Sequence, residues 1–290
     1  MSQSISHGFN NSAWSNVVQW ILVTSSIASA LASDLLHLPS VTSGAWLSAS
    51  LMLFGLLHGA SIYGWRGSLF FIVVCLCVSN LMENVSILTG FPFGWYHYSA
   101  GLGPKIFLVP IMIGPAYFGV GYLSWTLARA ILGDKDAALN GVRHFTVPVM
   151  ASFIMVGWDL TMDPSMSTIQ GNWLWHQGGS YFGVPLQNFL GWYLTVYVFF
   201  QLFALYARYF HHSKRSSATN QPTAFAAPLL AYIAILLSPL LHLLIGMQYE
   251  LVKDPTGNAW QIHDIHVTAA LFCMFTLVPI WLLAFFRSNE

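Results

Sequence analysis

The chain has 290 residues, of which only 7% are charged, whereas 56% are hydrophobic and 16% are aromatic. A soluble domain carries about 25% charged residues, so this composition excludes an ordinary water-soluble protein. The formal net charge is zero and no basic stripe is present, which excludes a nucleic-acid-binding protein. The three cysteines lie within apolar runs, so a disulfide framework is not expected.

Apolar runs in chain order predict an all-α, polytopic integral membrane helical bundle that forms one transmembrane domain over residues 1–290. About 20 apolar residues cross a bilayer as a helix, and open sheets leave backbone groups unsatisfied in lipid. We predict eight spans: residues 17–38, 43–63, 68–90, 105–132, 144–163, 186–210, 224–246 and 265–286.

The first of these runs ends in SIASALASD, which resembles the cleavage region of a signal peptide. The residues before it contain no Lys or Arg, which the leading region of a signal peptide normally supplies. We therefore expect a retained first helix.

The cations are distributed unevenly about the predicted bundle, which indicates its orientation. Positively charged loops stay on the cytoplasmic side, so we expect both termini there, in a bacterial or archaeal cytoplasmic membrane. On that side lie Arg66, Arg129, Lys135, Arg143, Arg208, Lys214, Arg215 and Arg287, and on the other only Lys105 and Lys253.

Most carboxylates lie on the side of the predicted bundle opposite to most of the cations. They gather at the non-cytoplasmic ends of the spans, beside three long, aromatic-rich loops at residues 91–104, 164–185 and 247–264. Such loops are too aromatic for disorder, so we expect them to cover the helix ends. The acids of this face are Asp34, Glu83, Asp159, Asp163, Glu250, Asp254 and Asp264.

Glu83 lies inside the third predicted span, with Asn80 and Asn84 on the same helix face. An acid within a membrane is costly and suggests a functional site that faces the protein interior. Burial favours the protonated carboxyl, so Glu83 is a candidate proton donor that the two amides could orient. A structural acid hydrogen-bonded between helices is the alternative.

The fifth predicted span ends in GWDLTMDP, which places Asp159 and Asp163 four residues apart on one helix face. Two close acids do not both ionise easily in a dry site, which suits an acid/base pair. The same spacing suits Mg²⁺, and Asp163 could simply end the helix before Pro164.

The loop and helix start that follow contain Trp173, Trp175, His176, Tyr181 and Asn188. Aromatic faces stabilise cations, so this group could line a pocket, although an interfacial aromatic belt is the simpler interpretation for any single tryptophan. QIHDIH, from residue 261 to 266, contains possible metal ligands, but the polar start of a helix is the commoner explanation, and we predict no metal site.

Several stretches together resemble one known group of proteins. TGFPFGWYHY, GPK, VP, WDLTMDP, NWLW and YFGVPLQNFLGW, over roughly residues 80–195, are similar to the membrane-bound carotenoid biosynthesis family that includes bisanhydrobacterioruberin and γ-carotene-type hydratases. The aromatic turn of that family often reads Tyr-Asp-Tyr, whereas this chain has Tyr96-His97-Tyr98.

The resemblance implies hydration of a terminal double bond of a linear carotenoid or related isoprenoid without any cofactor. Glu83 or Asp159 would protonate the alkene, and the other acid or Asp163 would activate water. Trp95, Tyr96, Trp173 and Trp175 would stabilise the cation, and His97 and Tyr98 would help to bind an apolar substrate that arrives from the lipid bilayer.

Three alternatives remain open at this point. A proton-initiated membrane terpenoid cyclase would need the same residues, with an internal alkene in place of water. A Mg²⁺-dependent intramembrane prenyltransferase would use Asp159 and Asp163, although the acidic face offers few cations for a diphosphate. A transporter or lipid-binding scaffold would show an inverted repeat more readily than this sequence does.

Overall fold

The computed structural model describes residues 3–36, 40–135, 137–211, 223–245 and 249–290. The described chain is mostly helical, as predicted, and six of its helices are long and apolar enough to cross a membrane. The predicted number of eight spans and the cytoplasmic position of both termini stay predictions. The six candidate spans are Trp14–Ser33, Thr42–Thr89, Arg143–Ile169, Leu186–Phe210, Ala224–Leu244 and Ile262–Asn289.

Over the described ranges, the helical part consists of eight α-helices, two π-helical turns and one short 3₁₀ helix. The α-helices are α1 (Gln3–Leu35), α2 (Ser40–Thr89), α3 (Ile113–Ile131), α4 (Arg143–Pro164), α5 (Leu186–His211), α6 (Thr223–Ile245), α7 (Ile262–Phe272) and α8 (Val278–Asn289). The π-helical turns η2 (Ser165–Ile169) and η3 (Cys273–Leu277) extend α4 and join α7 to α8, and the 3₁₀ helix is η1 (Ala100–Leu102).

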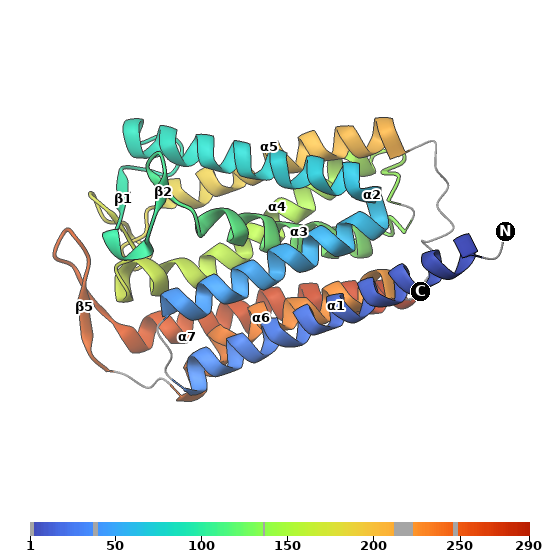
Figure 1. The fold of residues 1–290 in the computed structure, drawn as a ribbon. Coiled ribbons are helices and arrows are strands. Elements are labelled where there is room, and N and C mark those ends of the chain that lie inside the picture. Colours follow the sequence, from blue (N-terminus) through green and yellow to red (C-terminus); the bar gives the residue numbers. More distant parts are fainter. Residues whose placement is uncertain (1–2, 37–39, 136, 212–222, 246–248) are drawn as a thin grey trace.

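Helix α2 reverses direction at Gly64, so its 50 residues form two arms (Figure 1). Gly64 has φ 72° and ψ 164°, a conformation that essentially only glycine adopts. The Ser68 hydroxyl donates a hydrogen bond to the Leu56 carbonyl at 2.8 Å, although 12 residues of straight helix would separate them by about 18 Å. The first arm corresponds to the predicted span 43–63 and the second to 68–90.

Helix α3 packs between the two arms and forms the centre of the apolar core. Tyr122 pairs with His58 of the first arm at 2.6 Å and contacts the Phe71 ring of the second arm. Phe118 bridges the arms in the same way, because its ring lies against both Gly55 and Phe71. The glycines of the first arm let the α3 side chains approach the helix backbone closely.

The boundaries of two predicted spans need correction. The segment predicted as a helix from residue 105 begins instead with a hairpin of β2 (Lys105–Ile106) and β3 (Val109–Pro110), and α3 starts only at Ile113. Glycine, proline and a positive φ at Phe107 favour this turn over a helix. The last span starts at Ile262 rather than 265. The predicted ends at residues 38 and 246, and the side chain of Asp34, lie outside what the structure describes.

The three aromatic loops lie together at the end of the bundle away from the first turn of α1 and the last turn of α8 (Figure 1). They contain short strands. β1 (Tyr96–Tyr98) pairs antiparallel with β4 (Trp173–Trp175), and β5 (Leu251–Lys253) pairs with β6 (Ala259–Gln261). The described parts of these loops therefore contain regular secondary structure, and the expectation that the loops cover the helix ends stays a prediction.

Asp254 organises the turn of the β5–β6 hairpin. Its carboxylate accepts hydrogen bonds from the Thr256 hydroxyl at 2.7 Å and the Trp260 indole at 3.0 Å, and Asn258 donates two more. Burial acts to raise the pKa of Asp254, but these hydrogen bonds outweigh it and hold the pKa below its usual value. Gly178 and Gly183 pack against this turn, so the hairpin supports the loop that follows β4.

The bend in α2 yields a testable prediction. Gly64→Ala places a Cβ where only glycine is unstrained, so it costs about 1–3 kcal/mol and lowers the thermal denaturation temperature in detergent. Gly44→Ala is the matched control, because Gly44 lies in the same helix with open space around it. Alanine is about 0.5–1 kcal/mol better than glycine within a helix, so that variant is at least as stable as the wild type. Equal losses in both variants would contradict the strained bend.

Candidate active site

Glu83 lies on the second arm of α2, with 3% of its surface exposed, and accepts hydrogen bonds from three tyrosines. Tyr117 donates to Oε1 at 2.7 Å, Tyr98 donates to Oε2 at 3.0 Å, and Tyr96 also donates to Oε2. The donors come from β1 and α3, so three elements far apart in the sequence converge on one carboxyl group. Both of its oxygens are satisfied by hydroxyl donors, which is an arrangement that holds a buried carboxylate in a fixed orientation.

The pKa of Tyr98 responds to burial and to the nearby acids of this site. Burial raises its pKa well above the usual value, and the negative charges of Glu83 and Asp163 raise it further. Tyr98 therefore stays a neutral hydroxyl donor at all physiological pH values. Its dependence on both acids also indicates that Glu83 and Asp163 both lie near this tyrosine.

Asp163 and Asp159 form a second buried carboxyl centre, on α4. Asp163 is 1% exposed and accepts hydrogen bonds from the Trp173 indole and the Asn188 amide, each at 2.6 Å. The same Asn188 nitrogen lies 3.3 Å from Oδ2 of Asp159, which is fully buried. Oδ1 of Asp159 has no hydrogen-bond partner among the described residues. One amide thus bridges two carboxyl groups that the helix spacing had placed on one face.

The β1–β4 pair supplies hydrogen-bond donors to both carboxyl centres. Tyr98 is opposite Trp173 in the register and Tyr96 is opposite Trp175, so these four rings lie on one face of the two strands. Tyr96 and Tyr98 bind Glu83, Trp173 binds Asp163, and the Trp175 indole anchors the sheet to the Phe93 carbonyl at 3.1 Å. The sheet therefore fixes the position of one acid centre relative to the other.

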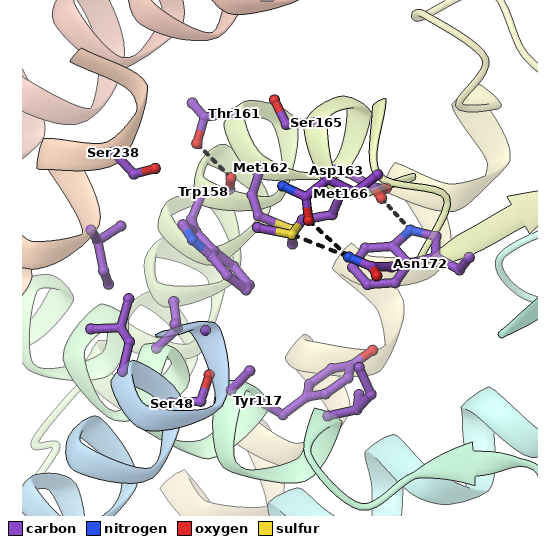
Figure 2. A pocket seen from close by; sticks show the side chains of 18 of the residues that line it. Ser48, Tyr117, Trp158, Thr161, Met162, Asp163, Ser165, Met166, Asn172 and Ser238 are labelled. Atoms are coloured by element: carbon purple, nitrogen blue, oxygen red, sulfur yellow. Dashed lines mark hydrogen bonds between the residues drawn. The ribbon is translucent and has the colours of Figure 1, made fainter. Parts of the chain in front are cut away.

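A mostly apolar cavity of about 210 Å³ opens between these two centres. Figure 2 shows Tyr117 and Ser48 on one side of it, facing Trp158, Met162 and Asp163 on the other. Trp192 stacks on Tyr117 with ring centroids 4.5 Å apart, which adds a second aromatic layer to the wall beside Glu83. The lining residues described by the structure include no Lys or Arg.

Eight of the residues singled out in the sequence line this cavity. They are Glu83, Asp163, Tyr96, Tyr98, Trp173, Trp175, Asn188 and His266. Asp159 lies directly behind them, joined through Asn188. Tyr181 is also behind the wall, where its hydroxyl donates to the Leu160 carbonyl at 3.0 Å. Burial and the charges of Asp163 and Asp159 raise the pKa of Tyr181 to about 12.

Three other predicted substrate-binding residues lie outside the cavity. Trp95 is 47% exposed and packs on Gly90. His97 is on the outer face of β1, where its Nδ1 pairs with Nε2 of His176 at 2.9 Å. The difference from the Tyr-Asp-Tyr pattern therefore falls on the exposed face of the strand, and the tyrosines on either side of it reach Glu83.

The amides expected to orient Glu83 are engaged elsewhere. Asn84 donates to the carbonyl oxygen and to the side-chain oxygen of Asn80, at 2.7 and 3.0 Å. Its own oxygen accepts a hydrogen bond from the backbone of Leu108 at 3.0 Å, which attaches the β2–β3 hairpin to α2. Residues four apart in a helix satisfy each other readily, and this local contact takes the place of the predicted one.

Tyr117, Trp158 and Trp192 complete the site and were not singled out in the sequence. Each lies in an apolar run, where an aromatic residue usually serves only as core. The hydroxyl group of Tyr117 was the signal in the sequence that could have identified it, because a buried tyrosine hydroxyl normally requires a hydrogen-bond partner. Of the possible metal ligands in QIHDIH, His263 and Asp264 form only a loose pair at 3.4 Å, whereas His266 lines the cavity. The described residues contain no group of three side chains suited to a metal.

The chain belongs to the carotenoid biosynthesis protein family, which it matches over residues 41–252. It is also similar to the bisanhydrobacterioruberin hydratase of Haloarcula japonica, with 32% identity over 115 residues. That alignment covers 39% of this chain and 37% of the relative, so the chain spans little more than a third of the curated protein it matches. No solved structure matches the chain. Family membership and the apolar helices together indicate a multi-pass membrane protein of carotenoid biosynthesis.

The tyrosine cluster yields a stability prediction. Glu83→Leu removes the acceptor of three buried hydroxyls, each of which costs about 1–3 kcal/mol when left unsatisfied. Glu83→Gln keeps one oxygen acceptor, so it destabilises the protein less than leucine does. Thermal denaturation in detergent measures the order, and Glu250→Leu at an exposed position serves as the control. A leucine variant as stable as the glutamine variant would show that the hydroxyls have other partners.

Proposed function

We propose that the protein hydrates a terminal double bond of a linear carotenoid or related isoprenoid, by protonation of the alkene and capture of the cation by water. The observation that supports this most directly is a pair of buried carboxyl centres facing one another across an aromatic-lined apolar cavity. An alkene hydratase needs an acid on one side of the double bond, a base for one bound water and exclusion of bulk water from the cation. Family membership supports the substrate class.

Asp163 donates the proton in this mechanism. It lines the cavity, and its carboxyl group is bridged to Asp159 by a single amide. Two buried carboxylates held this close repel each other when both are ionised, so the pair keeps one proton between them. Transfer of that proton to the CH carbon of the trisubstituted terminal alkene leaves a tertiary carbocation at the neighbouring dimethyl-substituted carbon and a second negative charge on the aspartate pair.

Glu83 activates water on the other side of the cavity. Three hydroxyl donors stabilise its carboxylate form and hold its position, which suits a base better than an acid. As the water oxygen bonds to the cationic carbon, Glu83 takes a proton from it. Return of that proton to the aspartate pair restores the resting enzyme, and the sum is one alkene plus one water giving one tertiary alcohol.

Aromatic faces protect the cation between these two steps. Tyr96 and Trp175 pack with ring centroids 5.8 Å apart, and Trp173 meets the Tyr98 ring edge-on. Rings of this kind attract a cation by about 0.5–2 kcal/mol each without capturing it as a nucleophile would.

A membrane terpenoid cyclase uses the same acid and aromatic wall, with an internal alkene in place of water. A cyclisation that ends in an alcohol or an alkene also needs a base, so Glu83 would serve either reaction, and hydration is favoured here by the similarity to a bisanhydrobacterioruberin hydratase. A prenyltransferase has less support, since the described lining contains no Lys or Arg to bind a diphosphate.

Product mass tests the proposal. In a host that accumulates linear carotenoids, the wild type gives a product heavier by the mass of one water, and in D₂O that product carries one carbon-bound deuterium. Glu83→Gln and Asp163→Asn each lower the rate by about 100-fold or more, as expected for loss of a general base or acid. Asp264→Asn, at an exposed position, is the matched control. A product with the same mass as the substrate would show that the protein cyclises the substrate and does not hydrate it.

The two faces of β1 give a second prediction. Tyr98→Phe removes one of the donors on Glu83 and lowers the hydration rate about tenfold or more, because a hydrogen bond to a charged group contributes about 1.5–3 kcal/mol. His97→Phe, at the adjacent outward position, leaves the rate within about twofold of the wild type. Initial rates of both variants, measured at equal protein concentration, provide the comparison. A larger effect at His97 would contradict this assignment of the strand faces.

A further inference from the structure

A separate pocket lies at the end of the bundle opposite the aromatic loops, beside the last turn of α8 (Figure 1). It has a volume of about 330 Å³ and lies between the turn that follows α3, the start of α4 and the last turn of α8. The Arg143 guanidinium reaches toward the turn after α3, since its Nη2 would lie 3.7 Å from a Cβ at Gly133. The described lining residues are Leu132, Gly133, Lys135, Arg143, Arg287 and Glu290. We call this the α3–α8 pocket.

The described lining of the α3–α8 pocket contains three cations and one acid. The acid, Glu290, accepts a hydrogen bond from Nη1 of Arg287 at 2.7 Å, so these two charges offset each other. The side chains of Lys135 and Arg143 form no ion pair or hydrogen bond with any residue that the structure describes. Asp134, which precedes Lys135 in the chain, is buried in an ion pair of its own. Over the described residues the pocket therefore has an excess of positive charge, which an anion would balance.

Exposed apolar side chains flank the cations of the α3–α8 pocket. Val142 and Phe145 are exposed beside Arg143, and Leu283 is exposed one helical turn before Arg287. Arg143 also begins one candidate membrane span, and Arg287 lies near the end of another. Cations at such a position meet the head groups of the lipids, while the apolar side chains next to them meet the acyl chains. A ligand that combines an anionic group with hydrocarbon chains therefore fits the pocket better than a small water-soluble anion.

We propose that the α3–α8 pocket binds the phosphate group of an anionic phospholipid from the surrounding membrane. The phosphate lies between Lys135 and Arg143, where the guanidinium donates two N–H groups to its oxygens and the ammonium adds a compact charge. The acyl chains lie along the exposed apolar side chains of α4 and α8. The bound lipid thus connects the ends of three helices, far from the acid cavity. The inference is independent of the hydration reaction.

Lipid binding to the purified protein in detergent tests this. The probes are phosphatidylglycerol, which is anionic, and phosphatidylcholine with the same acyl chains, which has no net charge. Native mass spectrometry measures the affinity of the first bound lipid. The wild type binds phosphatidylglycerol at least about fivefold more tightly, because each Lys or Arg near a membrane surface contributes about that factor to the binding of an anionic lipid. Inorganic phosphate at the same concentration does not displace the lipid, because it has no acyl chains.

Variants of the pocket identify the source of that preference. Lys135→Gln and Arg143→Gln each weaken phosphatidylglycerol binding about fivefold and leave phosphatidylcholine binding within about twofold. Glu290→Gln has the opposite effect, because it removes the carboxylate that competes for Arg287. Arg66→Gln is the matched control, since Arg66 is an exposed cation near the bend of α2, at the same end of the bundle but outside the pocket lining. Its lipid affinities stay within about twofold of those of the wild type.

Each other outcome overturns the inference. Equal wild-type affinities for the two lipids would show that no anionic head group is recognised. Equal losses in Arg66→Gln and Arg143→Gln would show that the overall charge of this end of the bundle attracts the lipid and the pocket does not. Displacement by inorganic phosphate would assign the pocket to a free anion instead. If Arg143→Gln folds poorly, Lys135→Gln decides the result, because the Lys135 side chain is exposed.

Discussion

The convergence of three tyrosine hydroxyls on Glu83 is the interaction on which the rest of the site depends. A carboxyl group inside a membrane protein is costly unless its oxygens are satisfied, and here β1 and α3 supply every donor. Tyr117 fixes α3 to the second arm of α2, and the two strand tyrosines fix the aromatic loops to the same point. The acid is thus both the polar centre of the cavity and the point where three elements are joined. Catalytic geometry and local stability are consequently linked at one residue.

The acids could be predicted from the sequence because buried charge is rare and expensive, and because four-residue spacing on a helix fixes a shared face. Glu83 and the Asp159–Asp163 pair were found on those grounds. Their partners could not be predicted in the same way. Tyr96 and Tyr98 reach Glu83 through the alternation of a three-residue strand, and Tyr117 reaches it from a helix 34 positions away. Contacts of this kind are set by packing between elements, which no local pattern specifies.

The difference between local sequence patterns and packing between elements also explains which residues of the first aromatic loop were predicted correctly to face the cavity. Sequence reasoning treated Trp95, Tyr96, His97 and Tyr98 as one group, because a coil has no preferred face. Strand pairing divides them into inward tyrosines and an outward histidine. The helix boundary near residue 105 was missed for a related reason: the apolar run continues through a hairpin whose glycine, proline and positive φ produce a turn. Overall helical architecture was easier to predict, since composition alone requires it.

The reversal of α2 at Gly64 has a mechanical consequence for the cavity. Its first arm contributes Ser48 and Leu51 to the lining, its second arm contributes Glu83, and the arms join only at the bend. The 19 residues from Gly64 to Glu83 form a lever of about 29 Å, so each degree of rotation at the bend displaces the carboxyl group by about half an ångström. Helix α3 fills the space between the arms and works as a spacer that fixes their angle. The α3 side chains Phe118 and Tyr122 therefore hold together the two arms that line the cavity, well away from the acids themselves.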